Sequence, residues 1–271
     1  MNNSDILNKS VKKAIGGGLS GFGAMLVQVS SLMWLRTTMN HQYKYGGSFF
    51  NTINKLYKEG GVTRFYRGYP YAILLGPLAR FGDTATNAFC TSYFTDKKYP
   101  LYIQTLFGSI MASSWRISLM PLDTLKTSLQ VDGKKGLGNL GIRIKQNGYR
   151  TLFNGTGASI SATMVGHYPW FMTYNYLNTY LPKYEENLLK NVSRNGAIGF
   201  SAAVISDCFS NSLRVVKTTK QTDIHNLSYS QTVTEIIKKD GLRGLFGRGL
   251  KTRIITNGLQ GILFNISWKY L

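Results

Sequence analysis

Five ionisable side chains stand within otherwise weakly charged stretches of this sequence: Arg80, Asp83, Arg116, His167 and Asp207. An ionisable group is costly in an apolar setting and usually persists there because it binds something or pairs with a partner. Arg80 and Asp83 are three residues apart, so on a helix they share a face and could pair with each other or hold a polar solute together. A lone histidine is more often an interior residue with satisfied hydrogen bonds than a ligand. The chemistry to expect is binding and charge pairing.

A repeated decapeptide relates three parts of the chain, with starts 90 and 91 residues apart. A second phrase, rich in glycine and aromatic residues, follows each decapeptide. The two sequence motifs occur in the same order three times, which indicates that one ancestral unit was used three times. We predict repeats at about 12–94, 101–181 and 195–271 within one domain of residues 1–271. The decapeptides are 31–40, 121–130 and 212–221, and the phrases are 61–68, 148–155 and 241–249.

The repeat gives two of the ionisable residues equivalent positions. Arg116 and Asp207 each lie five residues before the decapeptide of their repeat. Equivalent positions on neighbouring helices are expected at one depth and in one cavity. A direct ion pair between the two side chains and a shared contact with a solute are both open interpretations.

Apolar helices must position these residues. Residues 14–35 carry no charge, and the stretches 101–121 and 197–213 carry one charge each. These lengths approach what a bilayer crossing needs, and their small residues allow close helix packing in lipid. Glycine-rich loops of a soluble domain are the alternative, which the threefold recurrence disfavours. The predicted helices are 14–39, 69–94, 102–130, 156–181, 195–221 and 250–270.

Short surface helices are expected in the connectors between paired helices. Phe49, Ile53 and Leu56 have helical spacing within residues 48–58. Pro121 is predicted to kink its helix, and serine at the equivalent positions 31 and 212 is predicted to do the same. The fold class is therefore an all-α membrane protein of six transmembrane helices in three pseudo-symmetric repeats, each with a short surface helix in a basic connector.

Basic residues are distributed unevenly in this chain of net charge +20. Of 32 Lys and Arg residues, 20 fall in the segments 36–68, 126–155 and 217–253. Such loop asymmetry is typical of membrane topology, with the basic connectors on the electronegative side. Nucleic-acid binding competes as an explanation, but no recognition helix, zinc motif or aromatic platform accompanies the charge, so no nucleic-acid partner is expected.

Other function classes find little support in the sequence. Cys90 and Cys208 are the two cysteines, and they indicate neither a disulfide framework nor a metal cluster. No phosphate-binding loop or catalytic triad is recognisable, so we expect neither an enzyme nor a cofactor or metal. No cleavable secretory signal is visible in residues 1–13.

The middle decapeptide carries Pro121, Asp123 and Lys126 in the pattern Pro-x-Asp-x-x-Lys, with Gln130 at its end. Together with the threefold repeat and the glycine-aromatic phrase, this resembles the mitochondrial carrier family over essentially the whole chain. The resemblance implies a monomeric, multi-pass solute carrier of the mitochondrial inner membrane, with lipid such as cardiolipin at the connector helices. It also implies a bracing role for Gln130.

In the family, acids and bases of successive repeats form ion pairs that close the cavity on the matrix side. Carried over by position, Asp123 would meet Lys217. Lys126 would face an uncharged residue, and Arg214 would meet Arg36, which is repulsive. The resemblance therefore implies a weak gate. Either the basic ring attracts an anionic solute or lipid phosphate, or the protein no longer cycles as a strict exchanger.

Substrate selectivity in the family lies on the even-numbered helices, about seven residues past the conserved glycine. None of those positions is charged here, which disfavours a keto-acid, and the small residues are similar to those of nucleotide carriers. The substrate-binding residues implied here are Arg80, Asp83, Arg116, Asp207, Thr163, Thr256 and Asn257, and the gate residues are Asp123, Lys126, Lys217, Arg36, Arg214 and Gln130.

Two functional hypotheses follow from this interpretation. The leading one is a transporter that moves a small anionic, nucleotide-like metabolite by alternating access. The alternative is a carrier-like membrane receptor, scaffold or insertion factor that has lost transport, because relaxed selection would degrade the gate motifs. A transporter should depend on individual cavity charges, whereas a scaffold should not.

Overall fold

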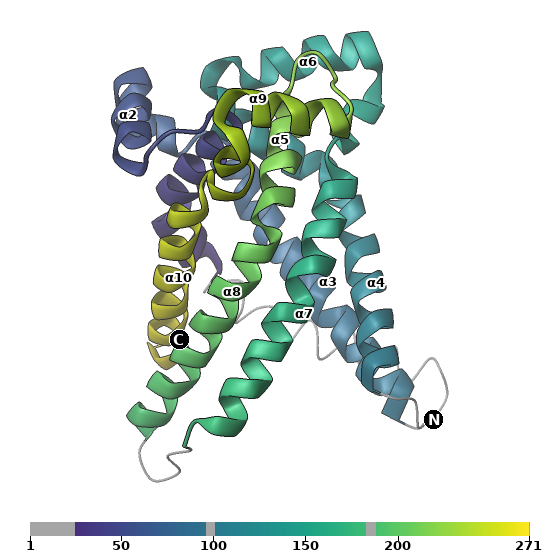
Figure 1. The fold of residues 1–271 in the computed structure, drawn as a ribbon, viewed down its shortest axis with the longest axis vertical. Helices are drawn as coiled ribbons and strands as arrows, with labels where there is room; N and C mark the ends of the chain where they lie inside the picture. Colours follow the sequence, from purple (N-terminus) through teal and green to yellow (C-terminus); the bar gives the residue numbers. More distant parts are fainter. Residues whose placement is uncertain (1–24, 96–100, 183–187, 271) are drawn as a thin grey trace.

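Long helices packed side by side form the body of the protein, and short helices lie across one end (Figure 1). The computed structural model describes residues 25–95, 101–182 and 188–270. Helices and turns account for this described part, in which no strand occurs. The long elements are the N-terminal helix (25–45), α3 (Tyr69–Thr95), α4 (Leu101–Ser118), α5 (Met120–Asp132), α7 (Thr156–Tyr180), α8 (Leu188–Thr222) and α10 (Leu250–Tyr270).

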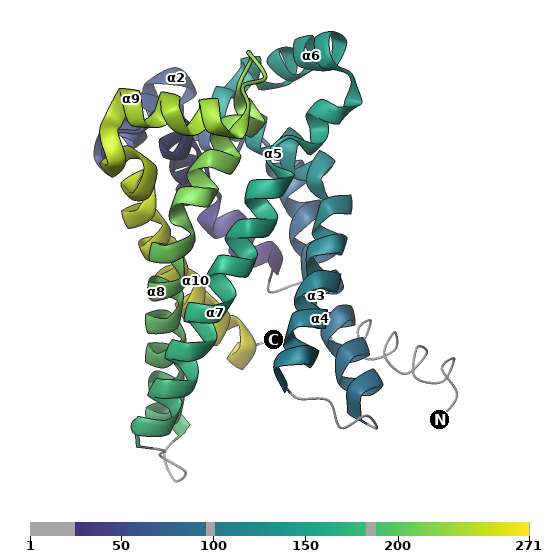
Figure 2. The same cartoon turned by 45° about the vertical axis from the view of Figure 1, so that its right-hand side comes forward.

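The connectors hold the short elements. These are α2 (Phe49–Phe65), η1 (Gly133–Lys135), α6 (Gly136–Asn147), η2 (Tyr149–Phe153) and α9 (Tyr229–Gly247). In Figures 1 and 2, α2, α6 and α9 gather at one end, where the long helices converge. We call this the connector end. Towards the opposite end the long helices spread apart.

The predicted helix boundaries agree closely with the observed ones. Residues 14–24 of the first predicted helix lie outside the described residues, and its visible part continues to residue 45. α8 begins at Leu188, earlier than the predicted 195. The added turns carry Arg194, which donates hydrogen bonds to the carbonyls of Asn178 (2.8 Å) and Leu181 (3.0 Å) at the end of α7. These hydrogen bonds from Arg194 to the end of α7 stabilise the added turns, so α8 is longer than its apolar stretch.

The predicted kinks differ among the three repeats. The helix is interrupted at Leu119, so α4 and α5 are separate, and Pro121 lies in the first turn of α5. The N-terminal helix and α8 continue without interruption through Ser31 and Ser212. Serine keeps the backbone N–H that proline lacks, so the helix can continue through both positions, and a bend at either serine stays a prediction.

The described parts of the apolar stretches lie in the long helices, and the stretch 101–121 runs across the break between α4 and α5. None of the helices in the described part of the chain combines the length with the apolar character that a membrane crossing requires.

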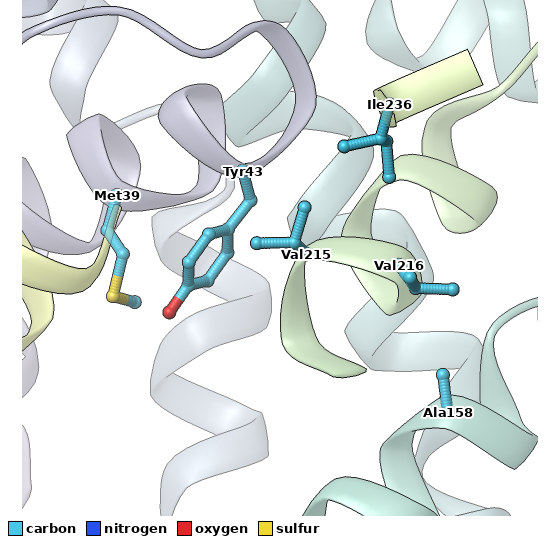
Figure 3. Close-up of a cluster of buried hydrophobic side chains, with 6 residues drawn as sticks. All are labelled: Met39, Tyr43, Ala158, Val215, Val216 and Ile236. Carbon is cyan, nitrogen blue, oxygen red and sulfur yellow. The ribbon is translucent and has the colours of Figure 1, made fainter. Parts of the chain in front are cut away.

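A buried cluster joins the first and third repeats near the connector end. Met39 and Tyr43 of the N-terminal helix pack with Val215 and Val216 of α8, and Ala158 and Ile236 complete the cluster. Figure 3 shows the Tyr43 ring between Met39 and Val215. The segments brought together here are far apart in sequence, so this apolar contact closes the ring of repeats.

Glycines that end the second phrase bring each repeat against the next one. Gly68 and Gly155 have φ of 86° and 84°, which glycine adopts without strain. A Cβ at Gly68 would lie 2.9 Å from the carbonyl oxygen of Lys126, and one at Gly155 would lie 2.9 Å from that of Lys217. The repeated glycine therefore lets the chain approach the decapeptide helix of the following repeat.

Gly136, at the start of α6, gives a matched pair of predictions with Gly141. A Cβ at Gly136 would lie 2.3 Å from the backbone oxygen of Ser128, so Gly136→Ala is expected to lower the free energy of unfolding by about 1–3 kcal/mol. A Cβ at Gly141 meets nothing within 4 Å. Gly141→Ala should therefore raise the free energy of unfolding by about 0.5–1 kcal/mol, because alanine suits a helix better than glycine does. Thermal unfolding of both purified variants measures these changes. Equal changes in stability in the two variants would contradict the prediction.

Candidate functional site

A cavity of about 420 Å³ lies among helices of all three repeats. Its basic residues are Arg36 of the N-terminal helix, Lys126 of α5, Arg214 and Lys217 of α8, and Arg253 of α10. Of the even-helix positions about seven residues past the conserved glycine, Leu75, Gly76, Thr256 and Asn257 line the same space, whereas Ala162 and Thr163 do not line it. The cavity is therefore polar and strongly basic.

Asp123 forms the ion pairs at the centre of this cavity. Its carboxylate is buried and lies 2.6 Å from the ammonium groups of both Lys126 and Lys217. Gln221 donates to the same carboxylate at 3.3 Å. The contact with Lys217 joins repeats two and three, as the family resemblance implied. Its role in gating stays a prediction.

Among the described residues, the interface between the first and second repeats has no such ion pair at this level. Instead the side-chain amide of Asn40 donates to the Gln130 side-chain oxygen at 2.6 Å. Gln130 is fully buried, and its amide lies 3.5 Å from the sulfur of Met33. Neutral hydrogen bonding thus occupies the place of a charge pair, and Lys126 turns to Asp123 of its own helix.

Arg36 and Arg214 lie on the wall of the same cavity. Arg36 donates a long hydrogen bond to the Gln260 side chain (3.5 Å), and Arg214 donates to the Ser210 hydroxyl (3.3 Å). Among the described residues, neither guanidinium has a carboxylate within 4.0 Å. These two positive charges are therefore held in the cavity by neutral partners only.

Asp207 binds a different partner from the one that its sequence position suggested. Its carboxylate is buried, pairs with Arg253 at 2.5 Å and accepts a hydrogen bond from Asn257. Arg116 instead lines a small pocket with Thr163, between α4 and α7. The helix is interrupted at Leu119, between Arg116 and its decapeptide, and the shared depth of Arg116 and Asp207 stays a prediction.

The other predicted contacts divide into two groups. Thr256 and Asn257 line the cavity, and the buried Thr256 hydroxyl donates to the Thr252 carbonyl at 2.7 Å. Arg80 and Asp83 are on α3, but their side chains lie outside the described residues. Arg80, Asp83, Arg116 and Thr163 therefore stay predictions as solute contacts.

A second cavity, of about 1050 Å³, extends from the first towards the start of α8. Arg214, Arg253, Asn257 and Gln260 line both spaces, so the two are continuous. Small α8 residues and the indole of Trp170 form much of its wall. The site thus combines a basic inner part with a wider, less charged outer part.

Sequence reasoning missed several residues of this site. Tyr43 lines the inner cavity, and its buried hydroxyl makes no hydrogen bond within the described part of the chain. Gln260 accepts a hydrogen bond from Arg36, and Arg253 forms an ion pair with Asp207. Asn40 carried a usable signal, because it ends its decapeptide as Gln130 and Gln221 end theirs.

Comparisons with known proteins support this architecture. A family model described as mitochondrial carrier protein matches the chain three times, at residues 8–98, 97–185 and 189–267. The chain is 23% identical to mitochondrial substrate carrier family protein D of Dictyostelium discoideum, over 92% of its own length and 86% of that protein. It is 24% identical to family protein C of the same organism, over 89% of the chain and 53% of the relative. The putative mitochondrial carrier protein PET8 of Saccharomyces cerevisiae is 27% identical, over 57% of the chain and 55% of the relative.

Proposed function

The chain belongs to the mitochondrial carrier family, and on that premise we propose that it moves a small anionic solute by alternating access, with the solute bound between Arg36 and Arg214. Members of this family are transporters and multi-pass proteins of the mitochondrial inner membrane, and the chain is located there as one of them.

The observation that carries the proposal is a pair of guanidinium groups in one cavity that have no carboxylate within 4.0 Å among the residues that the structure describes. Arg36 and Arg214 share their wall with Arg253, whose charge is already matched by Asp207. Like charges in a site of reduced dielectric repel each other unless water or an anion enters. Arginine forks also bind carboxylate and phosphate groups by two parallel hydrogen bonds. An anionic solute would satisfy both guanidinium groups.

The outer cavity supports a solute larger than an inorganic anion. Its wall offers small α8 residues and the ring of Trp170, and uncharged positions of α3 and α10 face the inner part. A planar ring can stack on an indole while its charged group lies among the arginines. We therefore propose a nucleotide-like anion, with the Tyr43 hydroxyl as an additional donor.

The proposed orientation places the long helices across the bilayer and the connector end on the matrix side. Basic residues concentrate in the connectors. Phe50, Tyr149 and Leu242, at the connector end, are 79%, 78% and 63% exposed. Apolar and basic groups together favour contact with anionic lipid, so we propose cardiolipin as a lipid partner there. The carrier is proposed to act as a monomer.

The test is uptake by proteoliposomes preloaded with a panel of nucleotides, carboxylates, amino acids and phosphate. We expect saturable exchange of one anionic class. Arg36→Gln and Arg214→Gln should each reduce it by about 10- to 100-fold, because charged hydrogen bonds contribute about 1.5–3 kcal/mol. Arg243→Gln, at an exposed connector arginine, should leave it unchanged. Exchange of a cation, or anion exchange that survives both cavity variants, would contradict the proposal. No uptake by folded, inserted protein would favour the receptor or scaffold alternative.

A further inference from the structure

We propose that three buried connector arginines, Arg64, Arg143 and Arg248, are positioning residues that hold the connector end of the cavity closed. Each donates hydrogen bonds to backbone carbonyls at the C-terminal end of the decapeptide helix of the next repeat. We call these three contacts the arginine clasps. The inference rests on the proposed transport function, because closure matters only if the cavity opens alternately at its two ends.

The first clasp joins repeats one and two. Arg64, at the end of α2, donates to the carbonyls of Gln130 (2.9 Å) and Val131 (2.8 Å) in the last turn of α5. Its side chain is 1% exposed, and its charge is matched by Glu59 at 2.9 Å. This clasp therefore lies beside the neutral contact of Gln130 with Asn40.

The second clasp joins repeats two and three. Arg143 of α6 donates to the carbonyls of Gln221 (2.5 Å) and Asp223 (3.3 Å) at the end of α8. It also donates to the Ser128 hydroxyl of α5 at 3.3 Å, which fixes it to its own repeat. Burial lowers the pKa of this guanidinium below its usual value, and the carboxylates of Asp132 and Asp223 oppose that effect.

The third clasp joins repeat three back to repeat one. Arg248 follows α9 and donates to the carbonyls of Lys44 (3.1 Å) and Tyr43 (3.4 Å) at the end of the N-terminal helix. Asp240 matches its charge at 2.7 Å. The ring is thereby complete, with one clasp at each interface between successive repeats.

Helix ends explain why arginine suits this task. The last carbonyls of a helix have no partner within the helix and carry partial negative charge, which favours a cation at this end. A guanidinium offers five N–H groups, so it can bind such carbonyls and a carboxylate of its own repeat at once. A buried cation with this many partners holds two repeats in a fixed relation.

The clasps do not follow from the repeat in the sequence. Arg64 and Arg248 come from the second phrase at different distances from its final glycine, and Arg143 precedes that phrase. Among the described residues that line the cavity, Asp123 and Lys217 form the one ion pair between repeats, and Lys44 and Asp223 form a longer one, at 3.7 Å, between repeats one and three nearer the connector end. The clasps supply a charged contact at all three interfaces, closer to the connector end. Opening that end would separate the repeats there and release the clasps.

Cysteine labelling in vesicles that expose the connector end tests this assignment. In a Cys90→Ser, Cys208→Ser background, Thr127→Cys reports on the inner cavity and Asn195→Cys on the outer cavity. With Arg64→Met, Arg143→Met or Arg248→Met, labelling of the Thr127→Cys reporter from the connector side should rise by about 10-fold or more, since charged hydrogen bonds are lost. Labelling of the Asn195→Cys reporter from the opposite side should fall. Arg243→Met is the exposed control.

The reciprocal readout separates gating from a general loss of structure. A loosened protein would be labelled faster from both sides, and that outcome, or unchanged labelling in folded variants, would overturn the proposal. If the arginine variants do not fold, Glu59→Gln and Asp240→Asn test the first and third clasps more mildly and should shift labelling in the same direction. Labelling needs no solute, so it measures the clasps separately from transport. If the parent protein moved no solute, the proposed function would be rejected, and the labelling result would still show whether the clasps hold the connector end closed.

Discussion

Asp123→Asn is expected to lower the free energy of unfolding by about 3 kcal/mol, because removing one partner of a buried ion pair leaves the other charge uncompensated. Here one carboxylate neutralises two ammonium groups, those of Lys126 and Lys217. All three side chains are at least three-quarters buried. The substitution preserves shape and removes only the charge. It also removes the ion pair that joins repeats two and three in the cavity, so solute exchange should fall sharply.

Thermal unfolding and proteoliposome exchange measure the two effects on the same preparation. Adding Lys217→Gln to Asp123→Asn should recover about half of the lost stability, because one of the two uncompensated charges is gone. Exchange should not recover, since the contact between repeats is still missing. Glu235→Gln, at an exposed acid of α9, is the control and should change neither quantity. An Asp123→Asn protein as stable as the parent would show that the ion pairs do not matter.

Asp207→Asn is expected to have the second large effect. Asp207 is 3% exposed and holds Arg253 on the wall shared by the two cavities. Without the carboxylate, the arginine loses its charge partner and its orientation, so the free energy of unfolding should fall by about 3 kcal/mol. Exchange should fall by about 100-fold, because a misplaced binding group loses its interactions in the bound state.

A double variant separates folding from function at this position. Asp207→Asn with Arg253→Gln removes both charges and should restore most of the stability, because no buried ion is left unpaired. Exchange should stay low if Arg253 and Asp207 serve the solute. If exchange returns together with stability, their role is structural. In a receptor or scaffold, Asp207→Asn would lower only the amount of folded protein.

The sequence predicted the helices well because their signals are local. Apolar stretches and the threefold phrase placed α3, α7 and α10 within about one residue of their observed ends. The contact of Asp123 with Lys217 was also predicted, but from the family resemblance, which pairs the acid of one decapeptide with the base of the next. The helix break at Leu119 could not be read from the local pattern, because Pro121 marks a bend without fixing where the helix is interrupted.

Sequence by itself therefore determined the repeat, the order of the helices and the basic connectors. Tertiary structure alone decided the partners: Arg253 for Asp207, neutral contacts for Arg36 and Arg214, and helix ends for Arg64, Arg143 and Arg248. The reason is physical. Helical periodicity fixes which residues share a face, but the partner across an interface depends on how far each helix is rotated and shifted when three repeats pack together.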